Sequence, residues 1–347
     1  MKKSTKIKFF IFLFFLSAVF FLNVSMKGNG TRQDIPPVVI SSVVPTDVSP
    51  EVDTFQGNPI AFFDDYSWRL FIAMVWPAKA GERGLPDNTL SLDQPNTPKV
   101  FETYKSDWEI FKTDGSAPSP WNDFSTTVPC QTDPIGFNDM VLASFSKFGN
   151  LGQAGFGDLV GPLVAQNNTY VRFLTGFNQI EFQQITDQKL YVRSNLTNVT
   201  LGTGSIDVKS AWMVMNGVAH PERYYTRQAW VLDPNSGNCS KVLVGLVGLH
   251  IVQKTPSRPQ WIWTSFEQVD NVPQSGAIAP FAFNDGTVTP MPGSNPILFP
   301  PPAIPPSHFN VTRTMPINPS TVTTNQQYQQ ALKTRNSIWQ FYQLVET

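Results

Sequence analysis

The sequence predicts an α+β fold with an antiparallel, sheet-rich core. Five segments rich in β-branched and aromatic residues follow one another between residues 190 and 269, and turn-forming residues separate them. Helical patterns flank this region, at residues 58–77 and 325–347. Strands that are consecutive in sequence, with helices outside them, are typical of an antiparallel sheet covered by helices. We therefore expect N- and C-terminal helices to pack on the sheet.

The first 25 residues are predicted to be a secretory signal peptide. Lysines precede the apolar run Phe9–Leu22, which only Ser17 interrupts. This run is shorter than the roughly 20 residues that a comfortable transmembrane helix needs. A signal anchor is the alternative. We expect a secreted or periplasmic protein with no membrane span after signal removal, an extended segment at 26–54 and a single globular domain at 55–347.

The composition excludes some partners and leaves others open. Charged residues make up 15% of the chain and the net charge is −1, so no basic face for a nucleic acid is expected. Aromatic residues reach 13%, and these side chains either fill a core or form an exposed surface on which a sugar ring stacks. No H-x-x-x-H or H-E-x-x-H pattern occurs, so no metal site is predicted.

Two further features are typical of exported proteins. Cys130 and Cys239 are expected to form a disulfide, which would stabilise the fold by roughly 4–5 kcal/mol in the chain-entropy model. Two free thiols are the alternative. Asn-x-Ser/Thr sequons predict a glycoprotein if the source is eukaryotic; they begin at Asn23, Asn29, Asn167, Asn195, Asn198, Asn238 and Asn310.

The elements of the N-terminal half are predicted from apolar spacing. The helix in residues 58–77 is expected to be capped by Asp64 or Asp65 and to end before Pro77. A second, amphipathic helix is expected at residues 100–112, where aromatic side chains recur at spacings of 3, 4 and 3. Residues 149–161 are a glycine-rich loop, and residues 170–185 favour a helix.

The C-terminal half is predicted to supply the sheet. Strands are expected in residues 190–194, 198–215, 224–233, 239–255 and 260–269. Residues 290–306 contain eight prolines and are expected to form an extended strap along the domain. A final helix is predicted for residues 325–347.

His250 is the first candidate site residue. In strand alternation it shares a face with Val242, Val244, Leu246 and Gly248, and both faces of this strand are apolar. A histidine beside a glycine on such a face is suited to contact a ligand or a haem. The alternative is a core histidine that is hydrogen-bonded to one partner.

The next strand adds four candidates. Trp261, Trp263 and Ser265 share one face with Glu267, and Asp270 follows. Tryptophans beside a carboxylate could stack a sugar ring and hydrogen-bond its hydroxyls, whereas core packing is the alternative. Glu267 and Asp270 could also form an acid/base pair of the glycosidase kind.

Five segments resemble exported bacterial proteins known as cytochrome c family proteins. They are residues 67–77, 100–111, 178–185, 245–273 and 337–347, and GLHIVQKT…PQWIWTSFEQVDN is the most specific. The resemblance implies an exported location and a shared fold. Relatives of this kind carry a C-x-x-C-H haem motif after the final helix, whereas this chain contains none, so covalent haem attachment is not expected in it.

Three functions are compatible with these observations. The first is an exported binding or accessory protein whose small-molecule or glycan ligand contacts His250, Trp261, Trp263, Glu267 or Asp270. The second is a redox-associated protein that binds haem non-covalently through His250 or partners a cytochrome. The third is a secreted hydrolase that acts on polysaccharide.

Overall fold

The computed structural model describes residues 36–125, 136–144, 154–156, 159–233, 235–287, 305 and 310–347. The described residues belong to one compact unit. The predicted signal peptide, Cys130 with its expected disulfide, and nearly all of the predicted proline-rich strap lie outside the described residues. No helix in the described part of the chain is long and apolar enough to cross a membrane.

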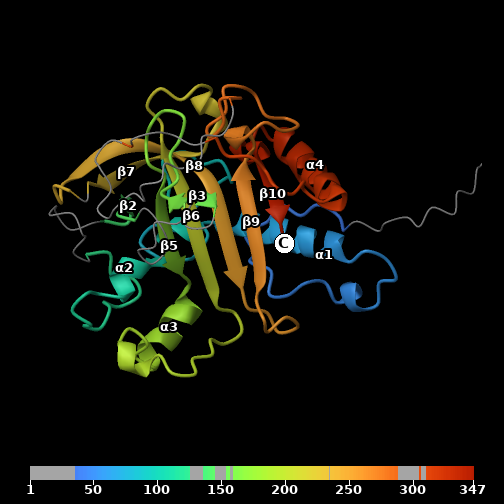
Figure 1. The fold of residues 1–347 in the computed structure, drawn as a ribbon. Helices are drawn as coiled ribbons and strands as arrows, with labels where there is room; N and C mark the ends of the chain where they lie inside the picture. Colours follow the sequence, from blue (N-terminus) through green and yellow to red (C-terminus); the bar gives the residue numbers. More distant parts are fainter. Residues whose placement is uncertain are drawn as a thin grey trace, which may run out of the picture. The chain divides into compact units, whose positions relative to one another are not determined.

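Strand β8 is the centre of an eight-stranded sheet (Figure 1). One edge of β8 pairs with β6, and its other edge is shared by β7 and β9. β5 and β1 extend the sheet beyond β6, and β10 extends it beyond β9. β3 and β4 form a separate two-stranded sheet within residues 149–161, where the glycine content predicts a loop, so that prediction is wrong for these two short strands. The strands are β1 (Lys105–Ser106), β2 (Val141–Leu142), β3 (Ala154–Phe156), β4 (Leu159–Gly161), β5 (Arg172–Phe177), β6 (Ile206–Val214), β7 (Thr226–Leu232), β8 (Cys239–Gln253), β9 (Ile262–Gln268) and β10 (Tyr342–Glu346).

The sheet is mixed and curled, so the prediction of an antiparallel sheet is wrong in this respect. β2 pairs with β7 in parallel, and Ser144, just after β2, forms a bridge with Phe173 of β5. The strands in the order β5-β6-β8-β7-β2 therefore form a nearly closed ring, because the segment that follows β2 contacts β5 again. β2 and β7 are far apart in sequence, so no hairpin imposes an antiparallel direction on them.

Helices from both ends of the chain pack beside the sheet, which confirms the α+β class. The helices are α1 (Ile60–Met74), α2 (Asp107–Ile110), α3 (Gln179–Asp187) and α4 (Pro319–Lys333). Figure 1 shows α1 and α4 side by side next to β10, and they contact each other and that strand. Trp68 of α1 stacks on Tyr328 of α4 at 5.0 Å, and Phe71 stacks on Phe266 of β9 at 4.1 Å. These aromatic contacts join helices and sheet in one core.

Three predicted helices are only partly helical. Residues 100–112 contain a 3-10 turn, then β1, then the single turn α2, which begins at a capping box of Ser106 and Glu109. In residues 170–185, β5 precedes α3, whose start is capped by Asn178. In residues 325–347, Asn336 has φ +53°, and the chain then forms a 3-10 turn and β10.

Two further expectations about element ends are wrong. α1 begins at Ile60, so Asp64 and Asp65 lie inside the helix and are buried. Residues 190–194 form a turn that leads into a 3-10 helix at Arg193–Asn195, rather than a strand. In α1, tertiary packing outweighs the local signal, because Tyr328 donates a hydrogen bond to Asp65 at 2.7 Å and so provides a partner for an acid inside the helix.

A β-bulge in β8 overturns the predicted face of His250. Gly248 pairs with Ala211 of β6 and Leu246 pairs with Trp212, which leaves Val247 as an extra residue. The alternation therefore shifts by one residue at Val247. Core side chains are Val244 and Leu246 before the bulge, and Leu249 and Ile251 after it. His250 lies on the opposite, outer face and is exposed.

Candidate functional site

A groove beside the start of β9 brings together several predicted site residues. Its volume is about 630 Å³, within the range of small-molecule sites. α1 and its preceding turn form one wall, and the segment that leads into β9 forms another. The groove is lined by Asn58, Pro59, Ile60, Phe63, Arg258, Gln260, Trp261, Ile262, Trp263, Ser265, Glu346 and Thr347.

Trp263 presents its side chain to solvent in this groove. Its neighbours Ile262 and Thr264 point into the core, so strand alternation turns Trp263 outward with an exposed fraction of 61%. Ser265 and Glu267 follow on the same face, which confirms the predicted alternation of β9. A large aromatic side chain with this exposure in a hollow is available to stack on a ligand.

Trp261 lines the same groove but lies before β9 rather than in it. Its φ is +77°, and its N–H group donates to the carbonyl oxygen of Arg258 at 3.3 Å. A positive φ is a rare and costly conformation for a bulky residue, and such conformations cluster at functional sites. The Lys254 ammonium lies 5.9 Å from the centre of the Trp261 ring. The turn thus places a second tryptophan in the groove.

His250 is one strand away from the groove. Its Nδ1 atom lies 2.8 Å from Oγ of Ser265, which is its neighbour across β8 and β9. On the other side of His250, Lys209 of β6 is the paired residue. Ser265 lines the groove and His250 does not, so the two residues connect the groove with the outer sheet face. The role of His250 as a haem ligand stays a prediction.

The two predicted acids are paired with arginines. Glu267 accepts from Arg313 at 2.6 Å. Asp270 is buried and accepts two bonds from Arg223 at 2.5 and 2.8 Å, and its carboxylate also accepts from the N–H group of Ile278. Neither acid lines the groove. Their contacts hold neighbouring loops, and the arginine partners come from distant segments that sequence reasoning could not connect to them.

Sequence reasoning also missed Phe63 and Arg258 in the groove. The Arg258 guanidinium lies 5.5 Å from the centre of the Phe63 ring and pairs with Asp53 at 2.8 Å. Phe63 belongs to the predicted helix, but only the tertiary fold places it opposite the tryptophans. The sequence does contain one signal for this place: Pro259, two residues before Trp261, indicates a turn at the surface of the molecule.

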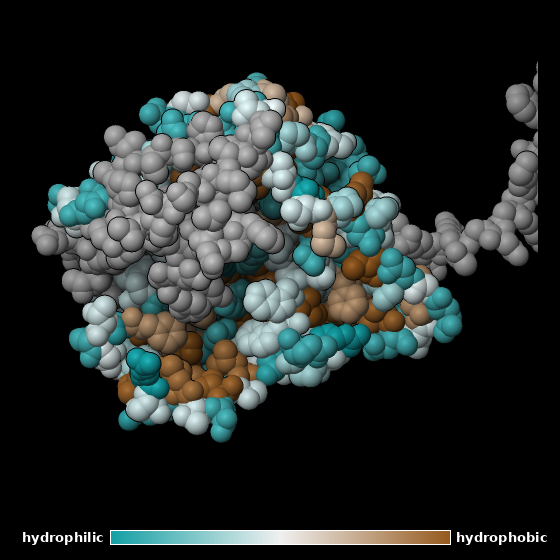
Figure 2. Space-filling model, viewed as in Figure 1, coloured by the Kyte–Doolittle hydropathy of each residue, from teal (hydrophilic) through white to brown (hydrophobic). Residues whose placement is uncertain are grey.

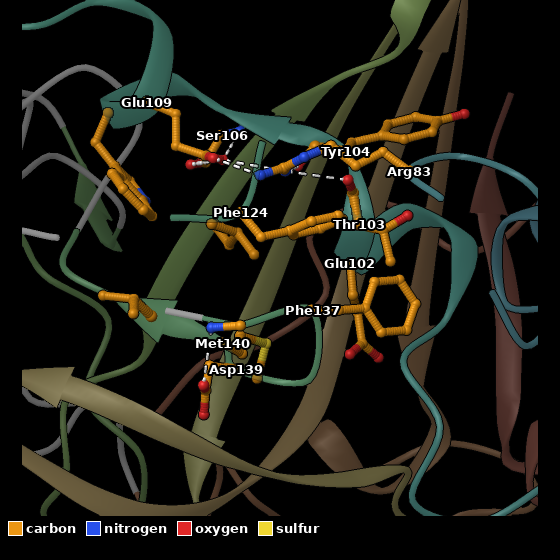
Figure 3. Close-up of a pocket in the computed structure, with 14 residues that line it drawn as sticks. Arg83, Glu102, Thr103, Tyr104, Ser106, Glu109, Phe124, Phe137, Asp139 and Met140 are labelled. Carbon is orange, nitrogen blue, oxygen red and sulfur yellow. Dashed lines mark hydrogen bonds and ion pairs between the residues drawn. The ribbon is translucent and has the colours of Figure 1, made fainter. Parts of the chain in front are cut away.

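A small cavity next to α2 and β2 is a second polar feature. Arg83 pairs with Glu109 at 2.6 Å, and Glu102 pairs with Arg227 at 3.1 Å. Figure 3 shows Phe124 between the Arg83–Glu109 pair and Glu102. Burial lowers the pKa of Arg83 below its ordinary value, while Glu109 opposes this change. The cavity volume of about 50 Å³ accommodates a few water molecules but no organic ligand.

A more apolar hollow of about 510 Å³ lies near the start of α3. Figure 2 shows hydrophobic atoms gathered over α3 and the loop after it. Ile180, Leu196 and Val199 are exposed apolar residues of this region. The tryptophan groove differs from this hollow because it combines an exposed aromatic ring with hydrogen-bonding side chains.

Comparisons of the chain with protein-family models, curated proteins and solved structures found no match. The resemblance to exported cytochrome c family proteins therefore stays a prediction. Within the described ranges, no three His, Cys, Asp or Glu side chains lie together as metal ligands would. The functional argument consequently depends on the geometry of the groove.

Proposed function

We propose that this protein is an exported carbohydrate-binding protein and that the Trp261–Trp263 groove is its binding site. The exposure of Trp263 carries the proposal, because a tryptophan that is 61% exposed gives up much of the stabilisation that burial of its ring would bring. That loss is understandable if the ring contacts a ligand. The positive φ of Trp261 independently supports a functional role for the same groove.

The chemistry of the groove suits a sugar. A pyranose ring offers an apolar C–H face that stacks on an indole ring, and hydroxyl groups around its rim. Gln260 and Ser265 provide donors and acceptors beside the tryptophans, and Arg258 provides further donors. A mostly apolar hollow with a few polar groups that fix orientation is typical of ligand sites.

The proposal is tested by carbohydrate binding. The mature protein is applied to insoluble cellulose, chitin and starch, and to an array of soluble glycans, with Trp263→Ala beside it. We expect retention on at least one glycan and at least a tenfold loss of affinity in Trp263→Ala, equivalent to about 1.4 kcal/mol.

Leu243→Ala is the matched control for this experiment. Leu243 is an exposed apolar residue of β8 that does not line the groove, so its removal should leave affinity unchanged. Absence of binding to every glycan, or equal losses in both variants, would contradict the proposal.

The Ser265–His250 contact favours a second candidate function, an acyl-transfer hydrolase. A serine hydroxyl 2.8 Å from an imidazole nitrogen is the geometry of a nucleophile and its general base. The serine oxygen would attack an ester carbonyl while the imidazole takes its proton and returns it to the departing alcohol; water then releases the acyl group. Covalent labelling by a fluorophosphonate that Ser265→Ala abolishes would support this candidate. Absence of labelling and of p-nitrophenyl acetate turnover would reject it.

A further inference from the structure

A row of polar side chains crosses the outer sheet face from the groove. Lys209 of β6, His250 of β8, Ser265 of β9 and Glu346 of β10 are successive cross-strand partners. Neighbouring strands lie about 4.8 Å apart, so this row extends over about 14 Å. Ser265 and Glu346 line the groove, and His250 and Lys209 continue the row beyond it.

Trp263 lies next to the polar row on the same sheet face. Trp263 pairs with Val252 of β8, which lies two residues from His250 on the same face. Residues two apart along a strand are separated by about 6.8 Å. A ligand that follows β9 past Trp263 would therefore contact the indole ring first and then reach the polar row at Ser265 and His250.

We infer that the groove takes a polysaccharide chain that follows β9 from Trp261 past Trp263 and then passes over β8 at His250, rather than a single sugar. Trp261 and Trp263 are two stacking positions for two rings of the chain, and His250 contacts a ring beyond Trp263. This inference rests on the proposed function.

The size of the surface supports a chain as the ligand. One sugar ring can stack on only one of the two indoles, whereas joined rings occupy successive positions. Because the rings of a chain are linked, each additional contact adds affinity without a second loss of translational freedom. His250 is exposed and its Nδ1 atom is held by Ser265, so the orientation of its ring is set before the ligand arrives.

The test measures affinity against chain length by calorimetry. Cello-, chito- and malto-oligosaccharides of one to six rings are titrated into the mature protein, Trp263→Ala and His250→Ala. We expect affinity to rise at least tenfold between one ring and three and then to level off. His250→Ala should reduce this rise by at least threefold and leave the affinity for one or two rings unchanged. Trp263→Ala should weaken binding at every length.

The outcomes separate the inference from the proposed function. If affinity is the same for one ring and for six, while Trp263→Ala still abolishes binding, the groove binds single sugars and the inference is wrong. A His250→Ala variant that loses equal affinity at every length would also overturn it. If no oligosaccharide binds, or if Trp263→Ala changes nothing, the proposed function itself fails. His250→Gln, which keeps a hydrogen-bonding side chain, should recover part of the rise.

Discussion

Single buried polar side chains connect distant parts of this chain. Asn325 of α4 accepts a hydrogen bond from the Trp68 indole at 2.9 Å, and its side chain bonds the N–H and C=O groups of Leu344 at 3.0 and 2.8 Å. The amide thus pairs with the outer edge of β10 as a neighbouring strand would, and this satisfies backbone groups of an edge strand. One residue therefore connects α1, α4 and the last strand.

Asp64 is a buried acid whose ionisation opposes folding. Its side chain is fully buried, and burial raises its pKa to about 6, although hydroxyl groups of Thr321 and Thr347 oppose this rise. Because the folded-state pKa exceeds the unfolded value, the contribution of Asp64 to stability is complete below about pH 4 and is lost as pH rises towards 6. The loss corresponds to about 3 kcal/mol at most.

We predict that Asp64→Asn removes this pH dependence. The amide is close in shape to the protonated acid but does not ionise, so the variant should be more stable than the native protein at pH 7 and similar to it at pH 4. Urea unfolding at several pH values between 4 and 7 measures the difference. Asp187→Asn, at an exposed position of α3, is the control. Parallel stability curves for Asp64→Asn and the native protein would contradict the prediction.

At the scale of elements, β8 shows what alternation can and cannot predict. β9 is regular, so the shared face of Trp263, Ser265 and Glu267 followed from sequence. β8 contains an extra residue at Val247, so regular alternation places His250 on the wrong face. Gly248 beside it is a weak signal of a bulge, because a glycine inside a strand often marks one, but it does not fix the position of the extra residue. Helical spacing was similarly ambiguous in residues 100–112 and 325–347, because a 3-10 turn followed by a short strand also buries residues three and four apart.

Tertiary contacts explain the remaining differences at the site. Phe63 and Arg258 come to the groove from segments that only folding brings together, and the arginine partners of Glu267 and Asp270 lie 46 and 47 residues away along the chain. Trp261 was expected on the face of a strand, but a positive φ places it in a turn. Its presence in the groove was still predictable, because it is a tryptophan next to a proline-containing turn.

Two glycines of β8 should respond in opposite ways to a methyl group. A Cβ atom at Gly245 would collide with Sδ of the buried Met215 and lie 3.3 Å from Cβ of Tyr224. At Gly248 the nearest atom would be Cβ of Ala211 at 3.6 Å, an ordinary contact. We predict that Gly245→Ala lowers the free energy of unfolding by about 1–2 kcal/mol. Gly248→Ala should leave it unchanged or raise it by up to about 1 kcal/mol, because alanine restricts the unfolded chain.

The two substitutions are controls for each other, since they are three residues apart on one strand. Chemical denaturation at constant pH measures both. Equal effects of the two substitutions would contradict the prediction, because they would show that Met215 does not crowd Gly245 more closely than Ala211 crowds Gly248.

At the scale of the whole molecule, the interior holds several cations although charged residues are few. Within the described ranges, the buried basic side chains are Arg83, Lys99, Lys105, Arg172 and Arg227. Lys99 donates to the carbonyl oxygen of Leu92 at 2.8 Å, and Lys105 donates to that of Pro120 at 2.8 Å. These lysines hold loops against the core through backbone oxygens, which satisfies the ammonium groups without removing the cost of burying a charge.

Because a buried ammonium charge is costly, the free energy of unfolding changes with pH in the alkaline range. Burial lowers the pKa of Lys99 to about 8, and Glu102 opposes the change; burial also lowers that of Lys105 to about 8, and Glu109 opposes it. Between pH 8 and the unfolded value of 10.5, the unfolded chain retains protons that the folded chain has released. Stability therefore rises with pH in this window. Buried tyrosines such as Tyr104, whose pKa burial raises, reverse the trend above about pH 10.

We predict that the native protein gains at least about 1 kcal/mol of unfolding free energy between pH 8 and 10. Lys99→Met keeps the length of the side chain and removes the ionisable group, so it should lose about half of that gain. Lys333→Met, at an exposed position at the end of α4, should keep all of it. Guanidinium unfolding at pH 7, 8, 9 and 10 measures the three proteins under the same ionic strength. A native protein whose stability falls steadily above pH 8 would show that the buried ammonium groups stay protonated, and that their contacts with backbone oxygens outweigh the cost of burial.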